Sequence, residues 1–502
     1  MNIPWVGITK RMNIFQNFYF DNSFLYPTQA FLMLAFLYVF LSAVVITVII
    51  ICLRKHEKIL LAISNDPVLS LLIVTMIVLG SRIVIMFFNS SHVQILPEKI
   101  FEMDTVGRDW LDGVMIPVMR LWKGLPFNPQ IGYGQGLTVF VGMLFYPFYI
   151  FGISTQETLV KFSQTSYIYM ASFVLLTYIV LIFTKYKNDI RNILIIVLMT
   201  FLFGYSGSLG LERGNTDIIF SLVMLLLYFF RMRKKGLLKH FDFVEACILG
   251  MLTASKITLL PISLAFILTS EKLLPSIIYF LLSYGVWSIS PTVFGIQSSL
   301  LDSYTASAIF QKSFFSNALS ISCWAGNHVL RGVASNFILC SQGALEEFKK
   351  VFLIMLNVIF YILAGTVFIL PLVPLALHLK NMTGSFISFI RYVYENRSRF
   401  FLLFLVLAVA AINLLPIFSF SYRLYFSFAV LLAAWHSIRN IQARKVLLLS
   451  TVCFLIKGMW FTDLKILNVF IALHYMSLIY ATSMEVSVTL VRRKDFYAGK
   501  KK

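Results

Sequence analysis

Long apolar runs separated by short charged segments constrain this chain more than any other feature of its sequence. Residues 29–53 and 68–88 are each long enough to cross a membrane, since a helix needs about 20 residues to span a hydrocarbon core of about 30 Å. Of the 502 residues, 59% are hydrophobic and only 13% are charged, whereas a soluble domain carries about 25% charged residues. The sequence therefore predicts an all-α polytopic membrane protein.

The formal net charge of +20 comes largely from basic residues in short segments between the apolar runs. These segments are 54–58, 185–191, 231–235, 439–445 and 492–502. Short basic loops mark the cytoplasmic side of a membrane protein, and they also attract anionic membrane lipid. We expect no nucleic-acid partner, because the chain has no basic domain on which a nucleic acid would bind.

Placing every basic segment in the cytoplasm predicts about 13 spans in one domain over residues 1–502. The predicted spans are 30–53, 68–88, 167–185, 192–208, 216–231, 244–255, 258–270, 273–291, 351–379, 399–417, 422–437, 444–461 and 466–489. Two large loops, 89–166 and 292–350, then lie outside, and the C-terminus is cytoplasmic. The apolar stretch 136–152 is expected to dip into the membrane without crossing it, because a crossing would expose the basic segment 231–235.

Residues 110–123 of the first outer loop are expected to form an amphipathic helix along the outer interface. Apolar residues recur there at intervals of three and four from Leu111 to Trp122, which is the helical period. Asp109 precedes this helix at the N-cap position, and Asp112 follows three residues later. Either carboxylate is therefore a candidate general base or simply part of a helix cap.

The other unusual polar residues also fall on the outer side of this topology. They are Arg213, Asn215, Asp217, Lys256, Asn327, His328, Arg331, Tyr422 and Arg423. Lys256 ends the short span 244–255, and a helix end at membrane depth faces a cavity. An ionisable residue there is a functional candidate, although a lysine can also snorkel to the interface. Carboxylates and cations together suit a site that removes a proton and holds a phosphate.

The same residues resemble the motifs of glycosyltransferase family 87, and they occur in the order in which that family carries them. The matching stretches are Asp109-Trp110 to Pro126-Phe127, Arg213-Gly214-Asn215, Ser255-Lys256 to Pro261, Asn327-His328 to Arg331, and Pro416 to Tyr422-Arg423-Leu424. They extend over most of the chain. His328 and Phe127 depart from the pattern, since the family usually has a small polar residue and a tyrosine at these places.

The resemblance implies a GT-C-like fold and a mannosyltransferase-like activity. A sugar would pass, with inversion, from a polyprenyl-phosphate-linked donor to a hydroxyl of a glycan or glycolipid. The site would lie on the periplasmic face of a multi-pass protein in the inner cell membrane. Asp109 or Asp112 would be the catalytic base. The substrate-binding residues would be Arg213, Asn215, Lys256, Asn327, His328, Arg331, Tyr422 and Arg423.

Neither a metal nor another cofactor is expected, because cationic side chains can stabilise a phosphate leaving group. Two other functions stay open at this point. A transporter or flippase of lipid-linked glycans would also use broken helices, although the chain has no two related halves. The third reading is a non-catalytic assembly subunit that retains the same fold.

Overall fold

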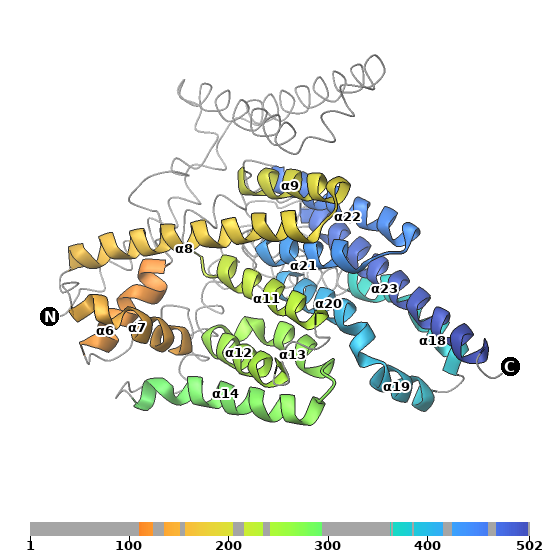
Figure 1. Ribbon diagram of the computed structural model, residues 1–502, viewed down its shortest axis with the longest axis horizontal. Coiled ribbons are helices and arrows are strands. Elements are labelled where there is room, and N and C mark those ends of the chain that lie inside the picture. The colour runs from red at the N-terminus through yellow and green to blue at the C-terminus, as the bar shows by residue number, and fades with distance from the viewer. Residues whose placement is uncertain are drawn as a thin grey trace, which may run out of the picture. The chain divides into compact units, whose positions relative to one another are not determined.

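The computed structural model describes part of the chain, and every described element is a helix (Figure 1). The described residues are 110–123, 135–150, 156–203, 215–233, 241–293, 362, 365–383, 386–414, 424–459 and 468–499. The first two predicted spans and the second outer loop lie outside them. For the described residues, the prediction of an all-α chain is confirmed.

The helices follow one another without any intervening described strand. They are η2 (Leu111–Met115), α6 (Ile116–Trp122), α7 (Gln135–Ile150), α8 (Gln156–Lys185), α9 (Asn188–Phe203), α11 (Asp217–Met232), α12 (Phe241–Ser255), η3 (Ile257–Leu259), α13 (Leu260–Leu268), α14 (Leu273–Val293), η4 (Leu370–Leu372), α18 (Val373–Thr383), α19 (Phe386–Glu395), η5 (Arg397–Phe400), α20 (Phe401–Leu414), α21 (Leu424–Ser437), α22 (Ile441–Met459) and α23 (Asn468–Gly499). Among the described residues, Thr165–Lys185 and Arg397–Leu414 are long and apolar enough to cross a membrane. They coincide with the predicted spans 167–185 and 399–417.

The chain divides into two compact units. One comprises Met1–Glu102 with Ile182–Gly204, and the other comprises Met103–Leu181 with Tyr205–Lys502. The first unit contributes only the end of α8 and α9 to the described residues, and in it the guanidinium of Arg191 lies 5.2 Å from the ring centre of Phe183. All other described helices belong to the second unit, and the packing described below is within it.

The chain reverses direction at Lys256, so α12 and α13 form a hairpin. The hydroxyls of Thr253 and Ser263 are 2.8 Å apart, and the Ser263 hydroxyl also reaches the carbonyl of Leu249 at 3.4 Å. In one continuous helix, residues 253 and 263 would be about 15 Å apart. The chain therefore turns back between the predicted segments 244–255 and 258–270.

Two pairs of neighbouring helices run parallel. Along α12 and α14, the rings of Phe243 and Tyr279 lie 4.8 Å apart, and one turn later Ser283 donates to the carbonyl of Cys247 at 2.7 Å. Along α11 and α21, Phe220 and Phe426 line one cavity. Further along this pair, the hydroxyl of Tyr228 donates to the carbonyl of Ala433 at 3.0 Å and contacts the Ser437 hydroxyl. Parallel packing is what the alternating topology predicts for both pairs.

Helices α22 and α23 form an antiparallel pair. The Ser450 hydroxyl of α22 lies 2.9 Å from Nδ1 of His474 near the start of α23. Further along α23, the carboxylate of Glu485 accepts hydrogen bonds from the backbone N–H groups of Arg439 and Asn440, just before α22 begins. This carboxylate supplies the anion that the amino end of a helix favours, and it fixes the turn between α21 and α22.

The basic residues of these turns gather at one end of the helices, which we call the basic end. Arg231 at the end of α11 donates to Phe266 and Thr269 at the end of α13. Arg397, just before α20, donates to the carbonyls of Ser270 and Glu271 in the next turn. Arg439 lies at the same end, because Ser437, two residues before it, contacts Tyr228, which is about one turn before Arg231. Asp217 and Lys256 lie at the opposite ends of α11 and α12.

A helix is present at the predicted residues 110–123, as η2 followed by α6, but it is buried on most of its sides and does not present one apolar and one polar face. Its first turn is π-helical, since the N–H of Ile116 donates to the carbonyl of Leu111, and Pro117 follows without a backbone N–H to donate. Trp110 is buried with its ring 6.5 Å from that of Tyr167 in α8. Trp122 donates to the carbonyl of Gly142 in α7 at 3.0 Å. Both tryptophans thus contact neighbouring helices.

Candidate functional site

A buried ion pair joins the amino end of α11 to the hairpin at Lys256. The ammonium nitrogen Nζ of Lys256 lies 2.5 Å from Oδ1 of Asp217. The Asp217 side chain is 1% exposed and that of Lys256 is 12% exposed. Burial of a single charge in such apolar surroundings would be costly, so each charge stabilises the other.

The stretch Asn215-Thr216-Asp217 forms the start of α11. The side-chain oxygen of Asn215 accepts a hydrogen bond from the backbone N–H of Asp217 at 2.9 Å, which is the Asx turn that asparagine favours before a helix. The carbonyl of Thr216 then accepts the N–H groups of Ile219 and Phe220. Asp217 consequently occupies the first turn, where the positive end of the helix dipole stabilises a carboxylate.

Lys256 occupies the break between α12 and η3. Its backbone is extended, with φ −154° and ψ 99°. Its N–H still donates to Leu252 in the last turn of α12, and its carbonyl accepts from Leu259 in η3. Pro261 follows in the first turn of α13, where a missing N–H costs nothing. The lysine therefore lies at the carboxyl end of α12, whose dipole favours a cation.

Two buried polar atoms beside the ion pair accept or donate no hydrogen bond among the described residues. They are Oδ2 of Asp217 and the hydroxyl oxygen of Thr216. Buried polar groups in native proteins are nearly always paired. A further polar group at the amino end of α11 would satisfy both atoms.

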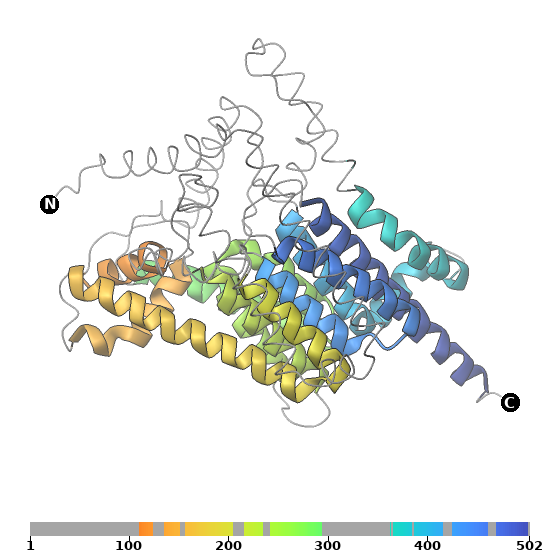
Figure 2. The same ribbon diagram turned by 90° about the horizontal axis from the view of Figure 1, so that it is seen from above.

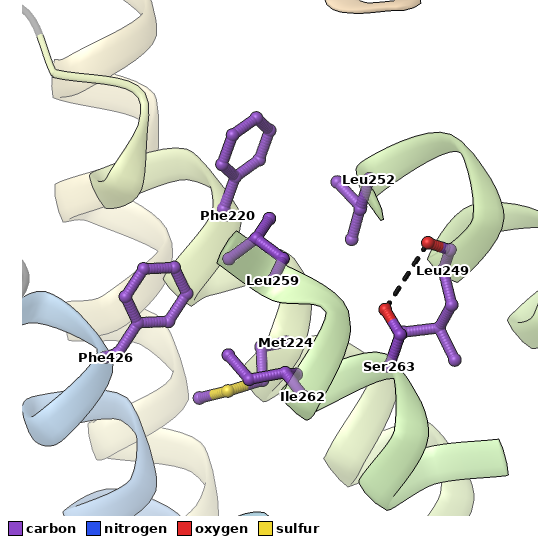
Figure 3. Close-up of a pocket in the computed structure, with 8 residues that line it drawn as sticks. All are labelled: Phe220, Met224, Leu249, Leu252, Leu259, Ile262, Ser263 and Phe426. Atoms are coloured by element: carbon purple, nitrogen blue, oxygen red, sulfur yellow. Dashed lines mark hydrogen bonds between the residues drawn. The ribbon is translucent and has the colours of Figure 1, made fainter. Parts of the chain in front are cut away.

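A small cavity is lined mainly by apolar side chains, of which Phe220 and Leu252 are about one helical turn from Asp217 and Lys256 along the chain (Figure 3). It is lined by Phe220, Met224, Leu249, Leu252, Leu259, Ile262, Ser263 and Phe426. Its volume of about 10 Å³ is about what one water molecule requires. A cavity of this size does not hold a sugar.

The structure brings two of the predicted site residues, Asn215 and Lys256, together around Asp217. Of Asp112, only the backbone position in η2 is described. The other predicted site residues lie outside the described part of the chain. They are Asp109, Arg213, Asn327, His328, Arg331, Tyr422 and Arg423.

The sequence places Asp217 on the outer side, but the predicted site residues do not include it. The predicted topology does put this acid, in the first turn of one span, at the same side of the membrane as the lysine at the end of the next span. Within the described ranges, no group of three or more histidine, cysteine, aspartate or glutamate side chains is placed to hold a metal ion.

Comparisons of the chain with protein-family models, with curated proteins and with solved structures found no match. The likeness to glycosyltransferase family 87 thus rests on the short motifs themselves. Among these motifs, the described residues include Asn215 and the Ser255-Lys256 to Pro261 step.

Proposed function

We propose that the chain is an integral membrane glycosyltransferase with a GT-C-like fold. It transfers a sugar from a polyprenyl-phosphate-linked donor to a hydroxyl of a glycan or glycolipid at the outer face of the cell membrane. The observation that carries the proposal is the buried pair of Asp217 and Lys256, at the ends of α11 and α12 that lie away from the basic end. The ordered motifs of the sequence support the same activity.

The distribution of charge supports the orientation in the membrane. Arg231, Arg397 and Arg439 belong to the basic end, and positive residues favour the cytoplasmic side. The opposite end, with Lys256 and Asp217, would then face outward. Helix α8 presents large apolar side chains to its surroundings, including Phe173, which is 68% exposed. Exposed apolar surface of this kind suits contact with lipid.

The ion pair gives Lys256 a defined place in the proposed reaction. A lysine ammonium at membrane depth binds a phosphate as a point charge, and the anchored carboxylate of Asp217 limits the positions that the ammonium can take. The acceptor oxygen bonds to the anomeric carbon while the bond from that carbon to the phosphate oxygen breaks. The phosphate leaves with the bonding electrons, and Asp109 takes the hydroxyl proton as general base.

Transport of a lipid-linked glycan is the second candidate function. The observation that favours it is the hairpin at Lys256, because α12 has 15 residues and α13 only nine. Short helices that meet around a polar residue at membrane depth are common in transporters. In a transporter, Lys256 and Asp217 would contact the cargo without any bond being broken.

The two functions differ in what happens to the donor. The purified chain is reconstituted into vesicles with polyprenyl-phosphate mannose and a glycolipid acceptor, and both lipids are quantified with time. Glycosyl transfer predicts one free polyprenyl phosphate for each glycosylated acceptor. It also predicts that Lys256→Met raises the KM for the donor. Lys272→Met, a change of an exposed lysine at the basic end, is the control and should leave this KM unchanged. Movement of intact donor across the bilayer without product would instead establish a transporter. If the donor is neither consumed nor moved across the bilayer, both proposals are overturned.

A further inference from the structure

Helix α19 exposes a narrow apolar stripe. Ile387, Ile390 and Tyr394 are 75%, 52% and 53% exposed. Their spacing of three and four residues places them along one side of the helix. A row of large apolar side chains on one exposed helix side is favoured by contact with an apolar environment.

The adjoining side of α19 is polar. Ser388, Arg391 and Glu395 are all exposed and recur at the same helical spacing as the apolar residues. Lys380 near the end of α18 is exposed as well. A short helix with one apolar and one charged side is the pattern of a helix that lies in a membrane interface.

Arg397 fixes the end of α19 to the basic end. Its guanidinium donates to the carbonyls of Ser270 and Glu271 at 2.8 Å each, and to the carbonyl of Tyr394 at 3.0 Å. The same guanidinium lies 4.6 Å from the ring centre of Tyr394. Figure 1 shows α19 at the end of the helices where α23 reaches the C-terminus, and Figure 2 shows that end of α23 from above.

Among the described elements, α19 packs mainly on α18 and η5, and the apolar stripe stays exposed. A stable protein–protein interface buries about 800 Å² on each partner, far more than three side chains supply. Arg391 of α19 and Lys380 of the neighbouring α18 are exposed cations that complement the negative charge of anionic headgroups. A lipid surface therefore fits this helix better than a protein partner does.

We propose that α19 binds the anionic headgroup layer of the inner leaflet. Ile387, Ile390 and Tyr394 enter the boundary between headgroups and acyl chains, while Arg391 and Lys380 contact lipid phosphates. The inference rests on the proposed membrane location, with the basic end cytoplasmic, and does not depend on glycosyl transfer. Its consequence is a headgroup-selective contact next to the turn that joins α13 to α14.

Spin labels on the full chain test the position of α19. Single cysteines replace Ile390, Glu395 and Phe173 in turn, in a background whose five native cysteines are replaced by alanine, and the proteins are placed in nanodiscs rich in phosphatidylglycerol. A label at 390 should be relaxed more by oxygen than by a water-soluble nickel complex, and a label at 395 should show the reverse. Equal nickel access at 390 and 395 would overturn the proposal, as would protection of 390 from both relaxants, which indicates a protein cover.

The label at position 173 in α8 separates this inference from the membrane location itself. Oxygen access at 173 without oxygen access at 390 would overturn only the role of α19. Nickel access at 173 would overturn the membrane location on which the inference rests. Oxygen access at both 173 and 390 is the expected result.

Lipid charge provides the second arm of the test. The dissociation constant for a short-chain phosphatidylglycerol, measured by native mass spectrometry, should rise about fivefold in Arg391→Gln, since one cation near an anionic surface is worth about 1 kcal/mol. Glu395→Gln on the same polar side is the matched control and should bind at least as tightly as the unaltered chain. Equal binding by Arg391→Gln and the unaltered chain, or equal binding of phosphatidylcholine, would overturn the selectivity for anionic lipid.

Discussion

Lys256 and Asp217 each lie at a helix end whose dipole favours the charge that the residue carries. Lys256 follows the last turn of α12, Asp217 begins α11, and the ammonium nitrogen and carboxylate oxygen are 2.5 Å apart. The pair therefore joins α11 to the α12–α13 hairpin. Removal of one partner leaves the other charge buried and unbalanced, whereas removal of both leaves none.

The first prediction concerns this coupling. Asp217→Asn and Lys256→Met should each lower the free energy of unfolding by about 3–5 kcal/mol, because each leaves a buried charge without its partner. The double variant should lose clearly less free energy of unfolding than the sum of the losses in the two single variants. Unfolding of the four proteins in mixed micelles, followed by circular dichroism, gives the coupling free energy. Strictly additive losses would mean that the two side chains do not stabilise one another.

Helices α12 and α14 approach each other closely at Gly250. A β-carbon at this position would lie 2.7 Å from Cβ of Ser283 and 2.8 Å from backbone atoms of Phe280 and Tyr284. Gly250→Val should therefore force the two helices apart and destabilise the protein by roughly 1–3 kcal/mol or more. The measurement is the unfolding midpoint of the purified protein.

Gly285 is the matched control for Gly250, because it lies in the middle of α14 and a β-carbon there would meet nothing within 4 Å. Gly285→Val should leave the unfolding midpoint close to that of the unaltered chain. A loss of stability as large as that of Gly250→Val would attribute the effect to the replacement of a helical glycine by valine and not to the close approach at Gly250.

The third prediction concerns Arg231 at the basic end. Its guanidinium lies 4.4 Å from the ring centre of Phe401, donates to Phe266 and Thr269, and is 3.6 Å from Glu245. Arg231→Met should cost about 3 kcal/mol or more, because it removes one partner of a buried pair. Arg231→Lys should recover only part of this, since lysine lacks the planar, forked guanidinium.

Arg233 provides the control for Arg231. It lies two residues further along and is exposed, so Arg233→Met should change the unfolding free energy by no more than about 0.5 kcal/mol. Equal losses in the variants of Arg231 and Arg233 would point to a general effect of positive charge at the basic end.

Charge position and hydrophobic length predicted much of the helical arrangement. The predicted spans 216–231 and 244–255 correspond to α11 (Asp217–Met232) and α12 (Phe241–Ser255), and the reversal at Lys256 followed from placing every basic segment on one side. The partnership of Lys256 with Asp217 could not be derived in this way. It depends on the rotation of two helices about their axes, which neither length nor charge determines.

The segment between the predicted spans 351–379 and 399–417 contains a helix that is not predicted from the sequence. The span 351–379 was expected to end before a loop, whereas α18 continues to Thr383 and α19 follows at Phe386–Glu395. Hydropathy averaged over a span-length window hides a helix of ten residues with one apolar side. The spacing of Ile387, Ile390 and Tyr394 would have revealed it, because residues three and four apart share a helix face.

The last prediction distinguishes the two candidate bases of the first outer loop. If Asp109 takes the acceptor proton, Asp109→Asn should insert into the membrane normally and lose roughly 10²–10⁴-fold in the rate of sugar transfer, the usual contribution of a general base. Asp112 lies in η2, and Asp112→Asn should keep most of the activity if that carboxylate only caps the helix. Initial rates with polyprenyl-phosphate mannose, normalised to the amount of folded protein, make the comparison. Full activity in Asp109→Asn together with loss in Asp112→Asn would assign the base to Asp112 and leave Asp109 as the cap.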